Sequence, residues 1–230
     1  MIIIDWNKLP FDLQKEEIKP YYESLKKKNV ELICKRIFDI IVSFVMILLL
    51  SPILLVLALW IRLDSPGNAI FKQVRVTQYG RSFKILKFRT MISNAERQGP
   101  QVTTEGDSRI THVGKKLRDL RLDELPQLFN ILKGDMTFVG TRPEVPKYVK
   151  SYSPEMLATL LLPAGVTSIA SIEFKDENRL MADSADTDDT YVNVVLPQKM
   201  KYNLAAIREY SFFNDIKTMF RTVGAVLKKD

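Results

Sequence analysis

Two acidic and two basic side chains lie in one stretch of the sequence, and their types suit chemistry on phosphate groups. Asp123 and Glu124 are adjacent, Arg118 precedes them, and Arg142 follows a glycine-containing turn. Arginine forks bind phosphate oxygens, and paired carboxylates hold hard divalent cations such as Mg²⁺. Acidic residues at the start of a helix are also ordinary helix caps. The flanking arginines favour a phosphate and metal site over simple capping.

A short amphipathic helix is predicted directly after the acidic pair. Apolar residues recur at helical spacing from Leu125 to Leu132. Pro126 fits the first turn, where its missing N–H is no loss, and Gly134 fits the residue that ends a helix. The acidic pair then lies at the helix N-terminus, where free N–H groups and the helix dipole favour ionised carboxylates.

The run around this helix resembles the catalytic core of the bacterial monotopic phosphoglycosyl transferases, also called bacterial sugar transferases. The matching run at 122–144 reads LDELPQLFNILKGDMTFVGTRPE. Other motifs of the resemblance are KRIFDI at 35–40, the Ser51-Pro52 pair, KFRTM at 87–91 and DSRITHVGKKLR at 107–118. The resemblance therefore extends from about Lys35 to the C-terminus.

The resemblance implies transfer of a sugar-1-phosphate from a UDP-sugar to polyprenyl (undecaprenyl) phosphate, with release of UMP. This reaction is the first membrane step in the synthesis of bacterial exopolysaccharide, O-antigen or glycoprotein glycans. It makes Asp123 the nucleophile that forms an aspartyl-phosphosugar intermediate, and Glu124 the catalytic ligand of Mg²⁺. It assigns phosphate or substrate binding to four basic residues: Arg118, Arg142, Arg89 and Lys87.

Composition agrees with a membrane-associated protein that handles anions. The chain has 230 residues, of which 46% are hydrophobic, and a formal net charge of +7. Such a basic excess suits nucleic acid, anionic lipid or phosphorylated substrates. A long apolar run favours the last two. Because no nucleic-acid reader module is recognised, we expect inner-membrane lipids and no nucleic acid among the partners.

The apolar run carries no charged side chain from Ile40 to Ile61. Pro52, near its middle, removes a backbone donor and is expected to bend or break a helix. Basic residues flank both ends of the run, and positive charge marks the cytoplasmic face of a membrane. A hairpin that enters and leaves on one face satisfies both flanks, whereas a kinked spanning helix is the alternative. The resemblance implies the re-entrant form, broken at Ser51 and Pro52.

Three segments are therefore expected. Residues 1–34 form a leader, either a helix on the membrane surface or a solvated arm. Residues 35–64 form the re-entrant helix-break-helix. Residues 65–230 form an α/β (α+β) catalytic domain, mainly helical with a small β-hairpin, on the cytoplasmic side of the bacterial inner membrane. Its C-terminal helices are expected to be interfacial.

Residue patterns predict the elements of the catalytic domain. The predicted elements are strands at 70–76 and 82–91, a loop and mobile lid at 92–108, helices at 113–122 and 144–153, a turn at 163–166, a strand at 167–174 and a helical tail at 199–227. One apolar stripe of the tail suits either core packing or the lipid headgroup region.

The sequence departs from the family pattern at a few positions. Arg121 and Thr141 replace the usual Ser or Thr and the usual Pro. Residues 168–172 read SIASI where many members have a Gly-Trp-Ala-Gln-Val run, so the identity of the sugar does not carry over. An acidic cluster suits a solvated loop better than a second metal site; its members are Asp183, Asp186, Asp188 and Asp189.

Two other classes of protein compete with the enzyme. A non-catalytic membrane scaffold would need no divalent metal and would tolerate loss of Asp123. A membrane-tethered nucleic-acid binder would bind duplexes with strong salt dependence. The dense group of carboxylates and arginines favours the enzyme. Association with a second copy or with downstream glycosyltransferases is compatible with the resemblance.

Overall fold

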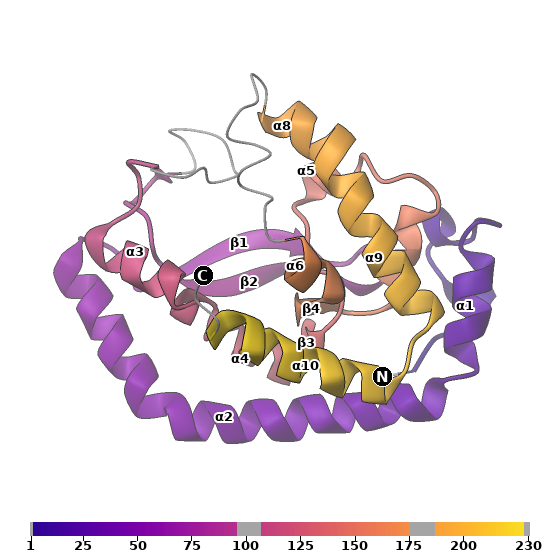
Figure 1. The fold of residues 1–230 in the computed structure, drawn as a ribbon, viewed down its shortest axis with the longest axis horizontal. Helices are drawn as coiled ribbons and strands as arrows, with labels where there is room; N and C mark the ends of the chain where they lie inside the picture. Colours follow the sequence, from indigo (N-terminus) through magenta and orange to yellow (C-terminus); the bar gives the residue numbers. More distant parts are fainter. Residues whose placement is uncertain (1, 96–106, 175–186, 228–230) are drawn as a thin grey trace.

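The computed structural model describes residues 2–95, 107–174 and 187–227. Helices predominate and surround two small two-stranded sheets near the centre (Figure 1). The strands are β1 Ile70–Val76, β2 Ser82–Phe88, β3 Met136–Val139 and β4 Ala164–Thr167. The α-helices are α1 Lys19–Lys26, α2 Asn29–Asp64, α3 His112–Asp119, α4 Gln127–Lys133, α5 Pro146–Val149, α6 Ile169–Glu173, α8 Thr187–Thr190, α9 Leu196–Arg208 and α10 Phe212–Leu227.

The long apolar run forms one continuous helix, α2, which begins at Asn29 rather than at Lys35. The predicted interruption is absent, because the helix continues through Pro52, although its last part turns away from the line of its first part (Figure 1). Pro52 cannot donate to the carbonyl of Leu48, and the hydroxyl of Ser51 donates to that oxygen instead, at 2.8 Å. The serine thus supplies the hydrogen bond that the proline removes.

One side of α2 is apolar and exposed, while its first turns hold it to the rest of the protein. Arg36 donates to the carbonyls of Ile131 and Leu132, at 2.7 and 2.9 Å, and so closes the C-terminal end of α4. Nearby, Lys35 donates to the Val139 carbonyl at 2.9 Å, and Asp39 accepts from the hydroxyl of Thr137. Within the part of the chain that is described, α2 is the helix long and apolar enough to cross a membrane, with a mean hydropathy of 3.0 in its most apolar window. The exposed large apolar residues of α2 are Val30, Ile33, Ile37, Ile40, Ile41, Phe44, Val45, Leu48, Leu49, Ile53, Leu55, Val56, Leu59, Trp60 and Leu63.

The predicted β-hairpin is confirmed. β1 pairs with β2 antiparallel, from Ile70 opposite Phe88 to Val76 opposite Ser82. The turn uses left-handed backbone at Tyr79 and Gly80. β2 ends at Phe88, three residues before the predicted end at residue 91. The hairpin therefore supplies a rigid support on which basic side chains are placed.

The second sheet was predicted incorrectly. β3 was missed, and β4 occupies the segment predicted as a turn at 163–166. The segment at 167–174, predicted as a strand, is mostly helix α6. The reason is a helix cap: the side chain of Ser168 accepts from the backbone N–H of Ser171 at 3.0 Å, which outweighs the β-propensity of the neighbouring isoleucines.

The leader neither lies apart from the domain nor extends into solvent. Its apolar side chains belong to the core cluster that also contains Leu161, Ile207 and Tyr210. Tyr21 adds a hydrogen bond to Glu155 at 2.5 Å. Residues 2–34 are thus part of the folded domain. The leader residues buried in this cluster are Ile3, Leu9, Leu13, Ile18, Tyr21, Tyr22, Leu25 and Leu32.

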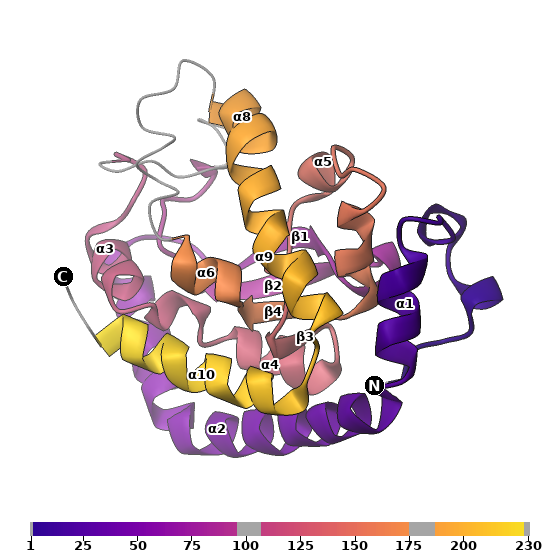
Figure 2. The ribbon, with the colours of Figure 1, turned by 45° about the vertical axis from the view of Figure 1, so that its right-hand side comes forward.

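The C-terminal tail is two helices rather than one. α9 and α10 are separated by residues 209–211, and α10 runs beside α2 (Figure 2). Phe213 and Phe220 of α10 are 81% and 75% exposed, and Val223 is exposed as well. This part of the predicted stripe is therefore not packed in the core, and it adds to the exposed apolar surface of α2.

Candidate active site

The acidic pair lies in a tight turn that leads into α4. Leu122–Glu124 form a 3-10 turn, and Pro126 comes directly before the helix. The residue before the turn, Arg121, has left-handed backbone with φ of 53°. Gly134 ends α4 with φ of 93°, so the predicted short helix with a glycine stop is confirmed.

Glu124 is held by two cations. Its Oε1 lies 3.1 Å from Lys87 Nζ and 2.5 Å from Arg142 Nη2, and its side chain is 13% exposed. Burial alone would raise the pKa of Glu124, but the charges of Arg142 and Lys87 outweigh burial and hold this pKa well below its usual range. Glu124 is therefore ionised at neutral pH and fixed in position.

Asp123 differs from its neighbour. Its side chain is buried, but within the described residues its carboxylate accepts no hydrogen bond. Burial raises the pKa of Asp123, and the charge of Glu124 adds to the rise, against the opposing effect of Lys87 and Arg118. Burial thus opposes the ionisation that the helix dipole was expected to favour, and the net direction of the pKa shift is upward.

Three separate elements bring cations to this acidic pair. Lys87 comes from β2, Arg142 follows β3, and Arg118 comes from α3. The guanidinium of Arg118 donates to Thr90 Oγ1 at 2.8 Å and interacts electrostatically with Asp123. These three basic residues and the two carboxylates form one constellation. The arrangement suits a polyanion bound against a free carboxylate.

Arg75 and Glu144 form a supporting pair that was not predicted. Arg75 Nη1 donates to the carbonyl of Pro143 at 3.0 Å and lies 3.8 Å from Glu144 Oε2. Glu144 in turn accepts from the hydroxyl of Tyr191 at 2.5 Å. This network holds the residues that directly follow Arg142. The hairpin register indicates it in retrospect, because Arg75 shares a face of the sheet with Lys87.

Comparison with known proteins identifies the family. The model of the family described as "Bacterial sugar transferase" matches residues 30–229. The chain belongs to this family.

Curated relatives support the assignment. The chain is 36% identical over 207 residues to the UDP-N-acetylgalactosamine-undecaprenyl-phosphate N-acetylgalactosaminephosphotransferase of Aeromonas hydrophila, covering 89% of this chain and 46% of the relative. It is 36% identical over 201 residues to the UDP-glucose:undecaprenyl-phosphate glucose-1-phosphate transferase of Caulobacter vibrioides, covering 85% of this chain and 70% of the relative. The chain thus spans about half of one relative and about two thirds of the other.

One residue assigned from the family resemblance, Arg89, lies outside the constellation of this family member. Its guanidinium donates to the carbonyls of Ser65 at 2.6 Å and Ile61 at 3.3 Å, and also to that of Pro66. These oxygens lie at the C-terminal end of α2, where a cation is favoured by unpaired carbonyls and the helix dipole. Arg89 therefore holds the C-terminal end of α2 in place.

The carboxylates of this family member suit Mg²⁺ only in combination with substrate. No group of three histidine, cysteine, aspartate or glutamate side chains gathers among the residues that the structure describes. Mg²⁺ is commonly held by one or two carboxylates together with substrate phosphates and water. Asp123 and Glu124 supply hard oxygen ligands of that kind. A metal here would be shared with a bound diphosphate.

Two other predictions concern segments that are described only in part. Most of the proposed lid at 92–108 lies outside the described residues, as do Asp183 and Asp186. Asp188 pairs with Lys147 and accepts from the hydroxyl of Tyr148. Asp188 is therefore engaged in a local contact that joins α8 to α5.

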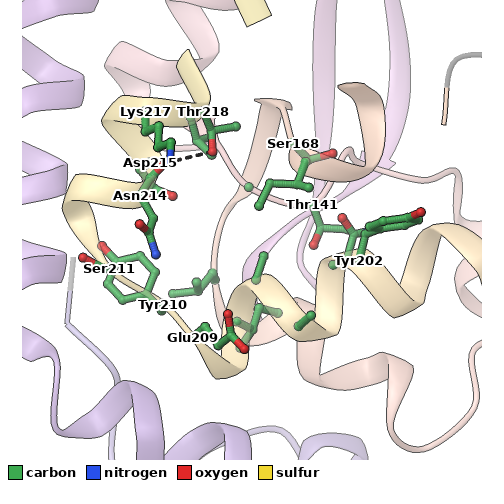
Figure 3. Close-up of a pocket in the computed structure, with 18 of the residues that line it drawn as sticks. Thr141, Ser168, Tyr202, Glu209, Tyr210, Ser211, Asn214, Asp215, Lys217 and Thr218 are labelled. Carbon is green, nitrogen blue, oxygen red and sulfur yellow. Dashed lines mark hydrogen bonds between the residues drawn. The ribbon is translucent and has the colours of Figure 1, made fainter. Parts of the chain in front are cut away.

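A cavity of about 300 Å³ lies between α9, α10 and the segments that follow β3 and β4 (Figure 3). Thr141 and Ser168 line one side, and Asn214 and Lys217 of α10 line the other. Neither Asp123 nor any cation of the constellation lines it. The cavity is thus separate from the acidic pair.

Proposed function

We propose that this sugar transferase moves a sugar-1-phosphate from a UDP-sugar to polyprenyl phosphate and releases UMP. The observation that carries the proposal is the asymmetry of the acidic pair: Glu124 is fixed by two cations, whereas Asp123 has no hydrogen bond within the described residues. A buried carboxylate without hydrogen-bonded partners is suited to act as a nucleophile. The names of the relatives describe the same class of reaction.

The reaction proceeds in two displacements at one phosphorus atom. A carboxylate oxygen of Asp123 attacks the β-phosphorus of the UDP-sugar, and the bond to the bridging oxygen breaks, so that UMP leaves with both bonding electrons. An oxygen of the lipid phosphate then attacks the same phosphorus and releases the carboxylate. The product is polyprenyl-diphosphate-sugar, and Asp123 returns to its starting state.

Positive charge at the site offsets the charge of two anionic substrates. Lys87, Arg118 and Arg142 surround the acidic pair, and such preorganised cations stabilise charge that develops during phosphoryl transfer. Mg²⁺, held by Glu124 together with substrate oxygens, would supply further charge neutralisation. Incubation of detergent-extracted protein with a panel of UDP-sugars, with UMP release as the readout, tests the proposal. No release of UMP from any UDP-sugar of the panel, even with the lipid acceptor present, would contradict the proposal.

We also propose that α2 enters and leaves the bacterial inner membrane on its cytoplasmic face. The exposed apolar side of α2, the exposed phenylalanines of α10 and the bend of α2 support this topology (Figure 1). Basic residues lie before α2 and after it, including Lys27 and Lys72. Such an arrangement brings a lipid phosphate and a soluble nucleotide to the same domain.

The topology predicts same-side labelling of both ends of α2. Cysteines at Lys27 and Asn68, exposed positions before and after the helix, are introduced in a Cys34→Ser background because Cys34 is exposed. A membrane-impermeant thiol reagent should label both from the cytoplasmic side alone. Labelling from opposite sides would show a spanning helix. Pro52→Ala restores the backbone donor, straightens the helix and should shift labelling towards that pattern.

The supporting role of Arg75 predicts a loss of activity that exceeds any loss of stability. Arg75→Lys keeps the charge but loses the planar fork that reaches Pro143 and Gln73. We expect turnover to fall about tenfold, equivalent to about 1.4 kcal/mol. Arg208→Lys, on an arginine that is 67% exposed, is the matched control and should retain turnover. Unchanged UMP release in Arg75→Lys would contradict the role.

A further inference from the structure

The side-chain amide of Gln127 is buried and has no hydrogen-bond partner among the residues that the structure describes. The residue is 1% exposed, and neither Nε2 nor Oε1 has a hydrogen bond. Buried amides in native proteins are almost always paired, because an unpaired one loses its hydrogen bonds to water without replacement. Gln127 therefore raises the free energy of the folded state in this conformation, and the fold gains no visible contact from its amide.

A second buried amide on the same helix, that of Asn130, has a clear structural role. Asn130 donates through Nδ2 to the carbonyl of Lys84 at 2.9 Å and accepts from the backbone N–H of Leu86, also at 2.9 Å. Both polar atoms of Asn130 thus hold α4 against the edge of β2. Gln127, nearly one turn earlier, contributes no such bond, so the position of α4 does not depend on its amide.

Gln127 shares a helical face with the acidic pair. The backbone hydrogen bonds from Leu125 N to Leu122 O and from Leu128 N to Leu125 O continue the turn into α4. Residues three and four positions apart on such a stretch are neighbours. Gln127 lies four residues after Asp123 and three after Glu124. By this spacing, Gln127 belongs to the same side of the chain as the two carboxylates.

We infer that Gln127 is a further substrate-binding residue, whose amide N–H groups donate to the phosphoryl oxygens of the phosphosugar carried on Asp123. This inference rests on the proposed function. In the free protein, no carboxylate oxygen of the described residues is hydrogen-bonded to the Gln127 amide. A phosphoryl group attached to Asp123 would bring further accepting oxygens to this side of the turn. The amide stays unpaired in the free protein and gains its partner when the phosphosugar is attached, so its hydrogen bonds favour the intermediate over the free site.

The experiment compares stability and turnover in the same variant. Gln127→Met keeps the length of the side chain and removes the amide. If the amide serves substrate, the melting temperature in detergent stays the same or rises, because an unpaired polar group is lost. At the same time the rate of UMP release and of adduct formation on Asp123 falls tenfold or more. Asn130→Leu, which removes a paired amide, should instead lower the melting temperature.

Three outcomes separate this inference from the function on which it rests. A fall in melting temperature in Gln127→Met as large as that in Asn130→Leu would show a structural amide and overturn the inference. Wild-type rates in Gln127→Met would overturn it as well, while the transferase function would stand. Absence of UMP release in the wild-type protein would overturn the proposed function and, with it, the role of Gln127.

Discussion

Asp123→Asn is expected to abolish sugar-phosphate transfer without loss of stability. The amide has almost the same size as the carboxylate but cannot attack phosphorus, so turnover should fall by roughly 10⁴-fold or more, the scale of losses when a covalent nucleophile is removed. The buried Asp123 accepts no hydrogen bond within the described residues, and burial already raises its pKa. A neutral amide is therefore tolerated there, and the melting temperature should stay the same or rise.

Asp119→Asn is the matched control for this variant. Asp119 is an exposed carboxylate at the end of α3, a few residues before the acidic pair. The same chemical change there should leave UMP release and stability near wild type. If Asp123→Asn keeps substantial turnover while the control behaves normally, Asp123 does not carry the reaction.

Glu124→Gln is expected to lower both activity and stability. Glu124 compensates the charges of Lys87 and Arg142, and its removal leaves two partly buried cations facing each other. Loss of one member of a buried ion pair costs about 3 kcal/mol, which lowers the melting temperature by roughly 6–12 °C for a chain of this size. Because Glu124 is also the proposed metal ligand, the response of turnover to added Mg²⁺ should weaken.

The pH dependence of this stability loss follows from the pKa of Glu124. The folded protein holds that pKa below the ordinary value of 4.5. The stabilisation is therefore fully present above about pH 4.5 and is lost as the pH falls towards the folded value. The difference in melting temperature between wild type and Glu124→Gln should be largest at neutral pH and shrink under acid conditions. A constant difference across this range would contradict the ion-pair account.

The sequence predicts the acidic turn well because its determinants are local. Pro126, the apolar spacing of α4 and Gly134 each act within a few residues, so the helix and its ends follow from the sequence. The hairpin follows in the same way from its strand residues and the turn at Gly80. The local structure around the acidic pair could thus be predicted from the sequence alone.

The errors concern contacts between segments that are distant in sequence. Arg89 was assigned to phosphate from the family resemblance of its motif, but its partners at the end of α2 lie more than twenty positions earlier. The parallel pairing of β3 with β4 depends on residues from Met136 to Thr167, and no turn residue marks it. The burial of the leader likewise depends on the far side of the domain, against Leu161.

The covalent role of Asp123 is tested most directly by mass spectrometry of the intact protein after reaction with a UDP-sugar in the absence of lipid acceptor. A covalent role of Asp123 predicts release of one UMP per active site and an added mass equal to the sugar phosphate, located on Asp123 and absent from Asp123→Asn. Addition of polyprenyl phosphate should then remove the adduct. UMP release that requires the lipid, with no adduct at any time, would contradict the account and indicate direct displacement in a ternary complex.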